Sequence, residues 1–194
     1  NTTEQEEERK RHIERIKSSV RNLSDILNDF LSLDKLEQGI VTINRESFDL
    51  SAFLENVVDE VSGLLKEEQQ IILSYYGIND IILDKVILKS ILLNLLSNSI
   101  KYSNTHTNIY LTAEVINNFI SISVKDEGIG IPKEEQNKLF NRFFRAKNVL
   151  SIQGTGLGLN IAKKYVALLN GNITFHSTHY VGTTFTVTFP RNTN

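Results

Sequence analysis

The sequence contains no cysteine among its 194 residues, which excludes disulfides, thiolate metal sites and cysteine nucleophiles. It also lacks methionine. Because it begins without an initiator methionine on an abruptly polar segment, we expect it to be a fragment of a longer protein. Its apolar stretches are broken by Asn, Asp or Lys well short of the ~18 residues that a membrane span needs, and no signal-peptide pattern opens it. We therefore expect a cytoplasmic fragment without membrane contact, although the parent protein could be membrane-anchored.

A large excess of either charge is also missing. The chain has 21 basic and 23 acidic residues, for a net charge of −2. This balance does not predict a nucleic-acid partner, because such proteins concentrate basic residues on one face. With 40% hydrophobic residues, the chain can bury the core of one domain plus an appendage.

The N-terminal segment, residues 4–38, predicts one long helix. Apolar residues recur there at spacings of three and four: Ile13, Ile16, Val20, Leu23, Leu27 and Phe30. Two charge pairs at i, i+4 support it, Glu6 with Lys10 and Glu7 with Arg11, and Gly39 is placed to end it. A helix of this length, on the order of 50 Å, should pack against other helices in a bundle or a dimer.

The rest of the chain predicts helices interleaved with antiparallel strands, an α+β fold in which helices cover one face of a sheet. After an extended stretch at 40–48, a helix capped by Asp49 or Ser51 should run through Leu65. Further helices are expected at 85–102 (capped by Asp84), 133–140 and 157–169, and strands at 71–76, 107–116, 119–125, 172–177 and 183–189. Asn117-Asn118 predicts a hairpin turn, because Asn tolerates positive φ.

The expected helix at 85–102 carries one polar stripe on an otherwise apolar surface. At about 100° per residue, the stripe spans an arc of roughly 100° and comprises Ser90, Asn94, Ser97, Asn98 and Lys101. Asparagine is a poor helix former, and burying its amide without partners costs roughly 1 to 3 kcal/mol. Two asparagines in a buried helix therefore indicate a ligand or a polar network.

Two glycine clusters follow this helix. Asp126-Glu-Gly-Ile-Gly130 comes at the end of a strand, where the carboxylate can accept a hydrogen bond from an exocyclic amine and the glycines admit a flat ring. An ordinary strand-ending turn is the alternative explanation. Gly154-Thr-Gly-Leu-Gly158 precedes a helix, where freed backbone N–H groups can bind phosphate, although a flexible hinge is also possible. Its spacing fits neither the dinucleotide nor the Walker A pattern.

Between the clusters lie three phenylalanines, Phe140, Phe143 and Phe144. Phe140 is expected to pack into the core at a helix end. The other two lie in a polar loop, 141–155, with glycines at its far end. This combination is typical of a lid that closes over a ligand.

These motifs together resemble those of sensor histidine kinases. Asn94-Leu-Leu-Ser-Asn98-Ser-Ile-Lys101-Tyr102 resembles the N box, Asp126 to Gly130 the G1 box, Phe140-Asn-Arg-Phe-Phe the F box, and Gly154 to Gly158 the G2 box. They occur in the family's order and cover about 84–190. The resemblance implies a Bergerat-type ATP-binding fold, a two-layer α/β sandwich.

The resemblance also implies roles for single residues. Asn98 is similar to the family's Mg²⁺ ligand, and Asn94 to the residue that assists at the metal and phosphates. Lys101 is similar to the phosphate-contacting lysine, and Tyr102 to the aromatic beside adenine. Asp126 is similar to the carboxylate that reads the adenine amino group. The remaining positions implied in ATP binding are Gly128 and Gly130, then Gly154, Thr155, Gly156, Leu157 and Gly158, and Thr183, which would support Asp126 through water.

The N-terminal helix resembles the second helix of the family's dimerisation and phosphotransfer hairpin. This implies a partial dimerisation helix at 1–39, a connection at 40–48 and a catalytic ATP-binding domain at 49–194. The first hairpin helix, with an acceptor histidine in a His-Glu-x-x-Thr-Pro-like context, is not in this sequence. His12 is the tempting substitute, but no second bundle-length helix follows it before the catalytic domain, so a solvated surface position is favoured.

The expected function is transfer of the ATP γ-phosphoryl group to a histidine outside this chain, with a homodimer and a response regulator receiver domain as partners. Two alternatives remain: a Bergerat-fold ATPase that works as a conformational switch, and a dimeric scaffold with a degenerate nucleotide site. The ATPases resemble one another in carrying a glutamate four residues before the metal asparagine. Here that position is Asn94, whose amide cannot act as a general base.

Overall fold

The computed structural model describes residues 2–149, 152 and 154–191, and it divides into two units, Asn1–Ile40 and Val41–Asn194. The first unit is one helix, α1 (Thr2–Glu37), followed by Gly39 at a φ of +66°. The predicted N-terminal helix is therefore confirmed. Both expected charge pairs involve side chains that lie outside the described residues. All the large apolar side chains of the expected seam are exposed, from 48% for Ile13 to 67% for Leu23.

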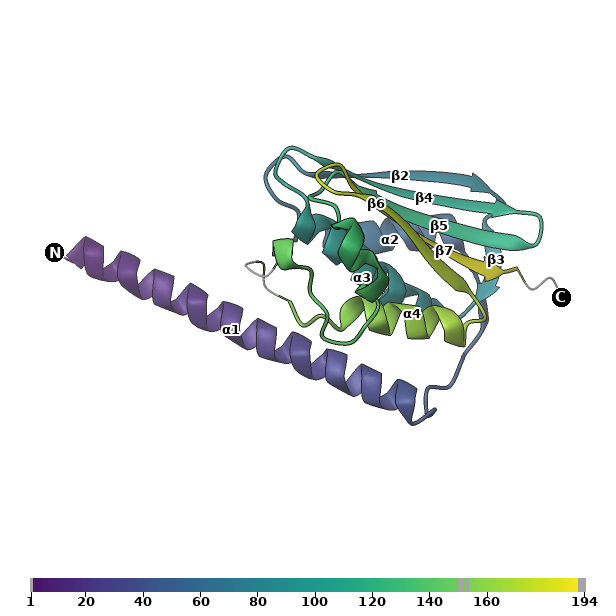
Figure 1. The fold of residues 1–194 in the computed structure, drawn as a ribbon, viewed down its shortest axis with the longest axis horizontal. Helices are drawn as coiled ribbons and strands as arrows, with labels where there is room; N and C mark the ends of the chain where they lie inside the picture. The colour runs from purple at the N-terminus through teal and green to yellow at the C-terminus, as the bar shows by residue number, and fades with distance from the viewer. Residues whose placement is uncertain (1, 150–151, 153, 192–194) are drawn as a thin grey trace. The chain divides into compact units, whose positions relative to one another are not determined.

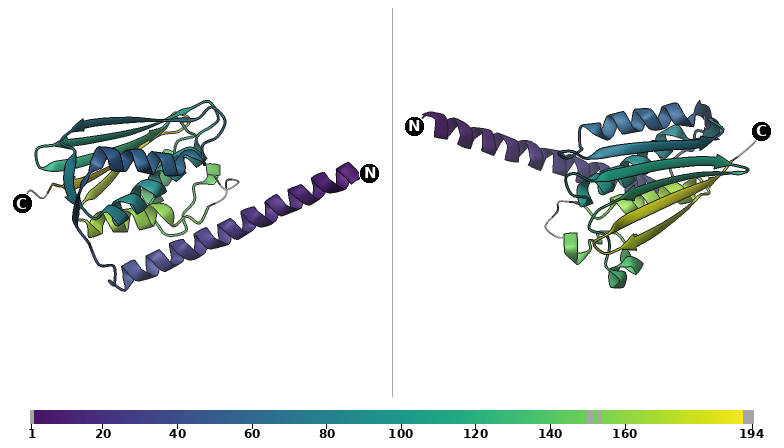
Figure 2. Two further views of the ribbon diagram at one scale, coloured as in Figure 1. Left: turned by 180° about the vertical axis from the view of Figure 1, so that it is seen from behind. Right: turned by 90° about the horizontal axis from the view of Figure 1, so that it is seen from above.

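The second unit is built on a five-stranded sheet in the order β2-β4-β5-β7-β6. Its strands are β2 (Gln70–Gly77), β4 (Asn108–Ile116), β5 (Phe119–Asp126), β6 (Asn172–Thr178) and β7 (Gly182–Pro190). Figures 1 and 2 show that three helices, α2 (Leu50–Ser62), α3 (Lys85–Tyr102) and α4 (Gly158–Leu168), cover one face of this sheet. The expected α+β architecture is confirmed.

Alternation along the strands explains this layering. In β4 and β5 every second side chain is buried beneath the helices, including Leu111, Ile122 and Val124 at 0% exposure. The hairpin between β4 and β5 turns at Asn117, whose φ is +53°, as its sequence predicts. The core thus lies between the sheet and the helices. None of the described helices carries an apolar stretch long enough to cross a bilayer.

Several details differ from the expectations. β2 pairs with β4 in parallel, and two short strands, β1 (Glu46–Asp49) and β3 (Asp80–Leu83), form a separate antiparallel ribbon that the sequence did not indicate. The helix expected to include Leu64 and Leu65 ends at Ser62, because Gly63 takes the C-cap position. The segment after Pro132 is a 3₁₀ helix, η1 (Lys133–Lys138), and the following loop holds another, η2 (Lys147–Val149).

The start of α3 is fixed by a buried carboxylate. Asp84 is 4% exposed and accepts hydrogen bonds from the backbone N–H groups of Ile87 (2.8 Å) and Asn44 (2.7 Å). The first bond caps the helix, and the second attaches the segment that enters this unit. Because α3 carries the polar stripe, its N-cap also sets the register of the site residues.

Replacing Asp84 with alanine should lower the free energy of unfolding by about 2 to 3 kcal/mol, because the buried cap bond to Ile87 and the bond from the Asn44 N–H are both lost. Asp84→Asn keeps an acceptor oxygen and should lose about half as much. Asp49→Ala is the matched control. It removes the exposed carboxylate that caps α2 by accepting a hydrogen bond from the Ala52 N–H at 2.8 Å, and it should lower the free energy of unfolding by about 1 kcal/mol. Urea denaturation measures all three. Equal losses for Asp84→Ala and Asp49→Ala would contradict the account.

Candidate nucleotide site

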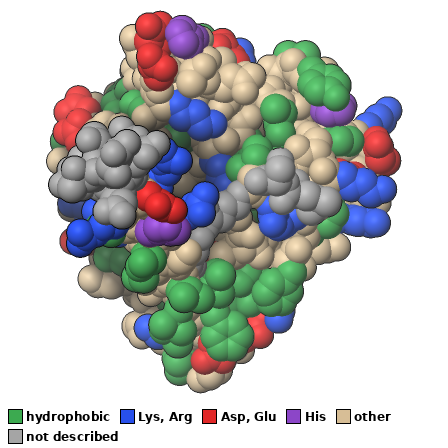
Figure 3. Space-filling model, turned by 90° about the vertical axis from the view of Figure 1, so that its left-hand side faces the viewer, with side chains coloured by type: hydrophobic (Ala, Val, Ile, Leu, Met, Phe, Trp, Pro, Cys, Tyr) green, Lys and Arg blue, Asp and Glu red, His purple; other side chains and the backbone are tan. Residues whose placement is uncertain are grey.

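The predicted site residues meet at one end of the second unit, where α3 ends, β5 ends and α4 begins (Figure 1). Figure 3 shows the molecule from this end, where Lys and Arg side chains are exposed at the surface. The polar stripe of α3 is confirmed: Asn94, Asn98 and Lys101 are half-buried, while the apolar residues expected around them are 0 to 4% exposed, namely Leu88, Ile91, Leu92, Leu95, Leu96 and Ile100.

Asp126, the last residue of β5, is a buried carboxylate at 6% exposure. Its Oδ1 accepts hydrogen bonds from the backbone N–H groups of Gly128 (3.0 Å) and Thr183 (3.1 Å). Its Oδ2 accepts one from the Ser99 hydroxyl of α3 at 3.3 Å. Three elements therefore hold the carboxylate in place.

Burial raises the pKa of Asp126 above its usual value of 3.8, against the opposing effect of these three hydrogen bonds. These hydrogen bonds therefore do not fully offset the cost of burying the ionised carboxylate. A ligand that donates a further hydrogen bond to this carboxylate would stabilise the charge. Such a perturbed acid among convergent polar groups is typical of a binding site.

The G1 glycines allow the loop after β5 to lie directly on the end of α3. A Cβ built at Gly128 would come within 2.6 Å of the Tyr102 carbonyl oxygen, and the next amide, of Ile129, donates to that same oxygen at 3.1 Å. Gly130 takes a φ of +61°. Any side chain at position 128 would push the loop away from the helix.

The G2 glycines make a similar approach to the middle of α3. A Cβ at Gly158 would lie 2.5 Å from Asn94 Oδ1, and one at Gly154 would lie 2.5 Å from Lys101 Nζ. The Asn94 amide is oriented by a bond from Nδ2 to the Ser90 carbonyl oxygen at 3.0 Å. The N-terminus of α4 therefore faces the polar stripe of α3, with no side chain of its own at the first position.

The turn before α4 is closed by its own residues. The Thr155 hydroxyl accepts a hydrogen bond from the Leu157 N–H at 3.1 Å. The Leu157 side chain is buried, with 2% of its surface exposed, and Gly156 takes a φ of +71°. Backbone N–H groups at the start of a helix are suited to bind anions. Four of the five G2 residues thus shape a loop beside Asn94 and Lys101, and the fifth starts the helix.

The F-box phenylalanines divide as expected. Phe140 packs edge-on against Phe175 at 5.8 Å between ring centroids, and its carbonyl oxygen accepts a bond from Asn160 Nδ2 of α4 at 2.7 Å. Phe143 is 67% exposed with a φ of +59°. A lid function for the loop remains a prediction.

The sequence reasoning missed two contributors to the Asp126 environment. Ser99 lies on the buried side of α3, and a lone serine in that apolar face was the available sign. Gly182 begins β7, where a Cβ would collide with the Asp126 carbonyl oxygen. Thr183 was expected to act through water, whereas here its backbone N–H contacts Asp126 directly and its hydroxyl lies 2.9 Å from Ser177 Oγ.

Asn98 lies one turn beyond Asn94 on the same stripe and is the expected metal ligand. Among the described residues, no group of three or more His, Asp or Glu side chains is arranged to hold a metal ion. A Mg²⁺ ion at Asn98 would therefore take most of its ligands from phosphate and water, which is its usual mode of binding with nucleotides.

Comparison with known families identifies this arrangement. Residues 83–193 match the family of "Histidine kinase-, DNA gyrase B-, and HSP90-like ATPase" proteins. The chain belongs to this family. The matched region begins just before α3 and contains every residue of the site described above. The candidate site therefore lies entirely within the part of the chain that matches the family.

Individual relatives are histidine kinases. The chain is 35% identical to hybrid signal transduction histidine kinase B of Dictyostelium discoideum, over 90% of this chain and 9% of that protein. It is 34% identical to sensor histidine kinase WalK of Bacillus subtilis, over 85% of this chain and 28% of the relative. The chain thus spans less than a third of the length of these relatives.

Solved structures share the fold. Histidine kinase AdeS of Acinetobacter baumannii superposes with a TM-score of 0.78 at 24% identity, covering 93% of this chain and 84% of that chain. Full-length ShkA in complex with AMPPNP gives 0.82 at 24% identity, covering 94% and 39%. The predicted fold, an ATP-binding domain of the sensor histidine kinase kind, is confirmed.

The buried state of Asp126 generates a pH-dependent prediction. Because the folded protein holds this proton more tightly than the unfolded chain, the group favours folding at low pH, and the contribution is lost as the pH rises through the raised pKa. Asp126→Asn removes this titration while keeping an acceptor for Gly128 and Thr183. The free energy of unfolding of the variant, relative to wild type, should therefore increase from pH 4 to pH 7 in urea titrations. A constant difference would contradict the account.

Proposed function

We propose that this chain is the ATP-binding catalytic part of a sensor histidine kinase, which transfers the ATP γ-phosphoryl group to a histidine outside this chain in two-component signal transduction. The observation that carries the proposal is the buried, incompletely compensated Asp126 carboxylate at the point where α3 meets the two glycine loops. This arrangement offers a hydrogen-bond acceptor for a nucleotide base, backbone N–H groups for phosphates and the side-chain amide of Asn98 for a metal ion.

Adenine would bind at Asp126. Its exocyclic amine would donate to the carboxylate and lower the pKa that burial raises. Gly128 and Gly130 leave room for a flat ring, and Tyr102 would lie beside it. The Thr183 N–H holds the carboxylate in position.

The phosphates would bind between α3 and the start of α4. Asn98 would hold Mg²⁺, which supplies charge neutralisation on the phosphate oxygens when bound. Lys101 would contact the phosphates from the α3 side, and the amides from Gly154 to Gly158 from the α4 side. Phosphoryl transfer asks the protein mainly for positioning and electrostatic stabilisation, which these groups can provide.

The geometry at Asn94 favours phosphotransfer over water-activating ATP hydrolysis. The Asn94 amide nitrogen is bonded to the Ser90 carbonyl oxygen and its Oδ1 faces Gly158, so no group at this position can accept a proton from water. Hydrolysis should therefore be slow. A degenerate scaffold is disfavoured by the several independent groups that converge on the site.

The partners follow from α1 and from the family. The exposed apolar seam of α1 would pair with the same seam of a second copy in a homodimer, as helices with this periodicity do. A response regulator receiver domain would accept the phosphoryl group in the next transfer, and the location would be cytoplasmic.

Asn98→Ala should weaken ATP binding in the presence of Mg²⁺ by about tenfold or more, the size of effect typical of changes at metal sites. Binding in EDTA should change little, because Asn98 would act through the metal. Isothermal titration calorimetry measures both. Asn56→Ala is the matched control, since Asn56 is an exposed helix asparagine whose Nδ2 bonds a carbonyl oxygen one turn back, at 2.7 Å. Unchanged Mg-ATP affinity in Asn98→Ala would remove Asn98 from the site.

Incubation with γ-labelled ATP should leave no acid-labile phosphate on this polypeptide, because its acceptor histidine lies elsewhere. His12 is exposed on α1, with Nε2 3.9 Å from Glu8 Oε1 one turn away. Acid-labile label that disappears in His12→Gln would show that His12 is the acceptor and refute this part of the proposal.

A further inference from the structure

The last turn of α3 is capped by two side chains from a distant turn of the chain. Lys66 Nζ donates to the carbonyl oxygens of Lys101, at 2.9 Å, and of Ser103. Gln69 Nε2 donates to the carbonyl oxygens of Ile100 (3.4 Å) and Asn104 (2.8 Å). We call these two side chains the Lys66–Gln69 cap.

The turn that carries the cap is itself well fixed. The Lys66 N–H donates to Gln69 Oε1 at 2.9 Å, and the Gln69 N–H donates to the Lys66 carbonyl oxygen at 3.0 Å. Gln69 is 5% exposed, and the His106 N–H bonds the Glu67 carbonyl oxygen at 3.1 Å. The backbone that carries Lys66 and Gln69 is therefore held in place by hydrogen bonds within the turn and to the segment after α3.

A helix end does not need such a cap for its hydrogen bonds alone. The last four carbonyl groups of a helix lack partners within the helix, and at a surface water can satisfy them. Here burial against these carbonyl oxygens removes part of the hydration of the Lys66 ammonium group and lowers the pKa of Lys66. A positive charge at a helix C-terminus recovers part of this cost and also fixes the helix end in space.

The capped turn carries two residues of the proposed nucleotide site. Lys101 Nζ lies beside Gly154 and 5.2 Å from the centre of the Tyr102 ring. The carbonyl oxygen of Tyr102 accepts the Ile129 N–H of the G1 loop, so this one turn contacts both glycine loops. Movement of its backbone would shift the Lys101 ammonium group relative to G2.

We propose that Lys66 and Gln69 are positioning residues for the phosphate contact: they hold the last turn of α3 so that Lys101 meets the phosphates beside Gly154. The inference rests on the proposed function, because it requires Lys101 to contact phosphate. Asp126 accepts two of its three hydrogen bonds from the Gly128 and Thr183 amides, which lie outside the capped turn, so recognition of the base should depend less on the cap than the phosphate contact does.

The test compares ATP with adenosine, which has the base but no phosphates. Lys66→Met should weaken Mg-ATP binding about tenfold, as expected when a charged group loses its fixed partner, and adenosine binding by less than about twofold. Lys66→Arg retains donors for the carbonyl oxygens and should restore most of the ATP affinity. Calorimetry with the whole chain gives the affinities, and circular dichroism confirms that each variant is folded at the temperature used.

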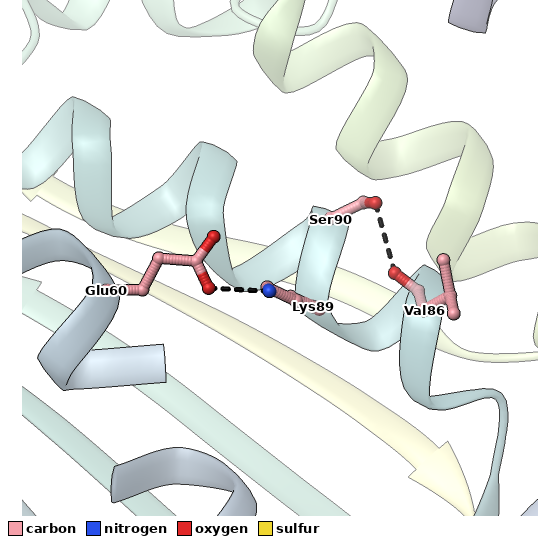
Figure 4. Close-up of polar contacts among 4 residues, drawn as sticks. All are labelled: Glu60, Val86, Lys89 and Ser90. Carbon is pink, nitrogen blue, oxygen red and sulfur yellow. Dashed lines mark hydrogen bonds and ion pairs between the residues drawn. The ribbon is translucent and has the colours of Figure 1, made fainter. Parts of the chain in front are cut away.

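Lys89→Met is the matched control. Lys89 lies near the other end of α3, where its Nζ is 2.5 Å from Glu60 Oε2 of α2, next to the bond from Ser90 Oγ to the Val86 carbonyl oxygen (Figure 4). This variant also loses a lysine contact on α3, but far from the capped turn. Its ratio of ATP to adenosine affinity should equal that of wild type.

Lys101→Met distinguishes failure of the cap proposal from failure of the proposed function. If it lowers ATP affinity but Lys66→Met does not, the cap proposal is overturned and the proposed function stands. If Lys101→Met and wild type bind ATP equally, or neither binds it, the proposed phosphate site fails and the cap proposal with it. Equal losses of ATP and adenosine in Lys66→Met would show a merely structural role. Lys66→Gln, which shortens the side chain, serves the same comparison if Lys66→Met does not fold.

Discussion

The close approach of the two glycine loops to α3 is the constraint on which the rest of the site depends. The G1 loop lies on the carbonyl oxygen of Tyr102 and the G2 loop on the side chain of Asn94, at distances that leave no room for a Cβ. Two loops that are separate in the sequence are thereby joined to the same helix. Asp126, Lys101 and the two glycine loops consequently lie around this one helix.

Burial at this junction has an energetic cost that a ligand can offset. Asp126 is desolvated, and the hydrogen bonds it accepts do not fully restore the stability of its charge. A preformed but incompletely satisfied acceptor favours ligands that bring a donor, which is a source of selectivity as well as of affinity. The domain therefore sacrifices some stability of its own at the position where it would recognise the base.

The features that the sequence predicted are local ones. The limits of α3 follow from Asp84 and from an apolar periodicity that no other structure fits, and the β4–β5 hairpin follows from its Asn117-Asn118 turn. The features that were missed depend on pairing across the chain. The strands β1 and β3 have four residues each, too few for a pattern, and the parallel pairing of β2 with β4 joins segments about forty residues apart.

The same distinction holds at the site. The asparagines and glycines carried their own signal, because those residue types are unusual in a buried helix and in clustered loops. Gln69 and the backbone amide of Thr183 did not, since their roles arise only when distant segments meet, and the lone Ser99 in an apolar face indicated a polar contact but not its partner. An ordinary serine or glutamine gives no indication of the carboxylate or carbonyl group that it will contact.

Nucleotide selectivity tests the central claim most directly. If Asp126 reads an exocyclic amine, calorimetry with Mg²⁺ should give clearly tighter binding of ATP than of GTP, because guanine presents a carbonyl oxygen where adenine presents its amino group, and two acceptors repel. Equal affinities for ATP and GTP, or no binding of either, would contradict the account.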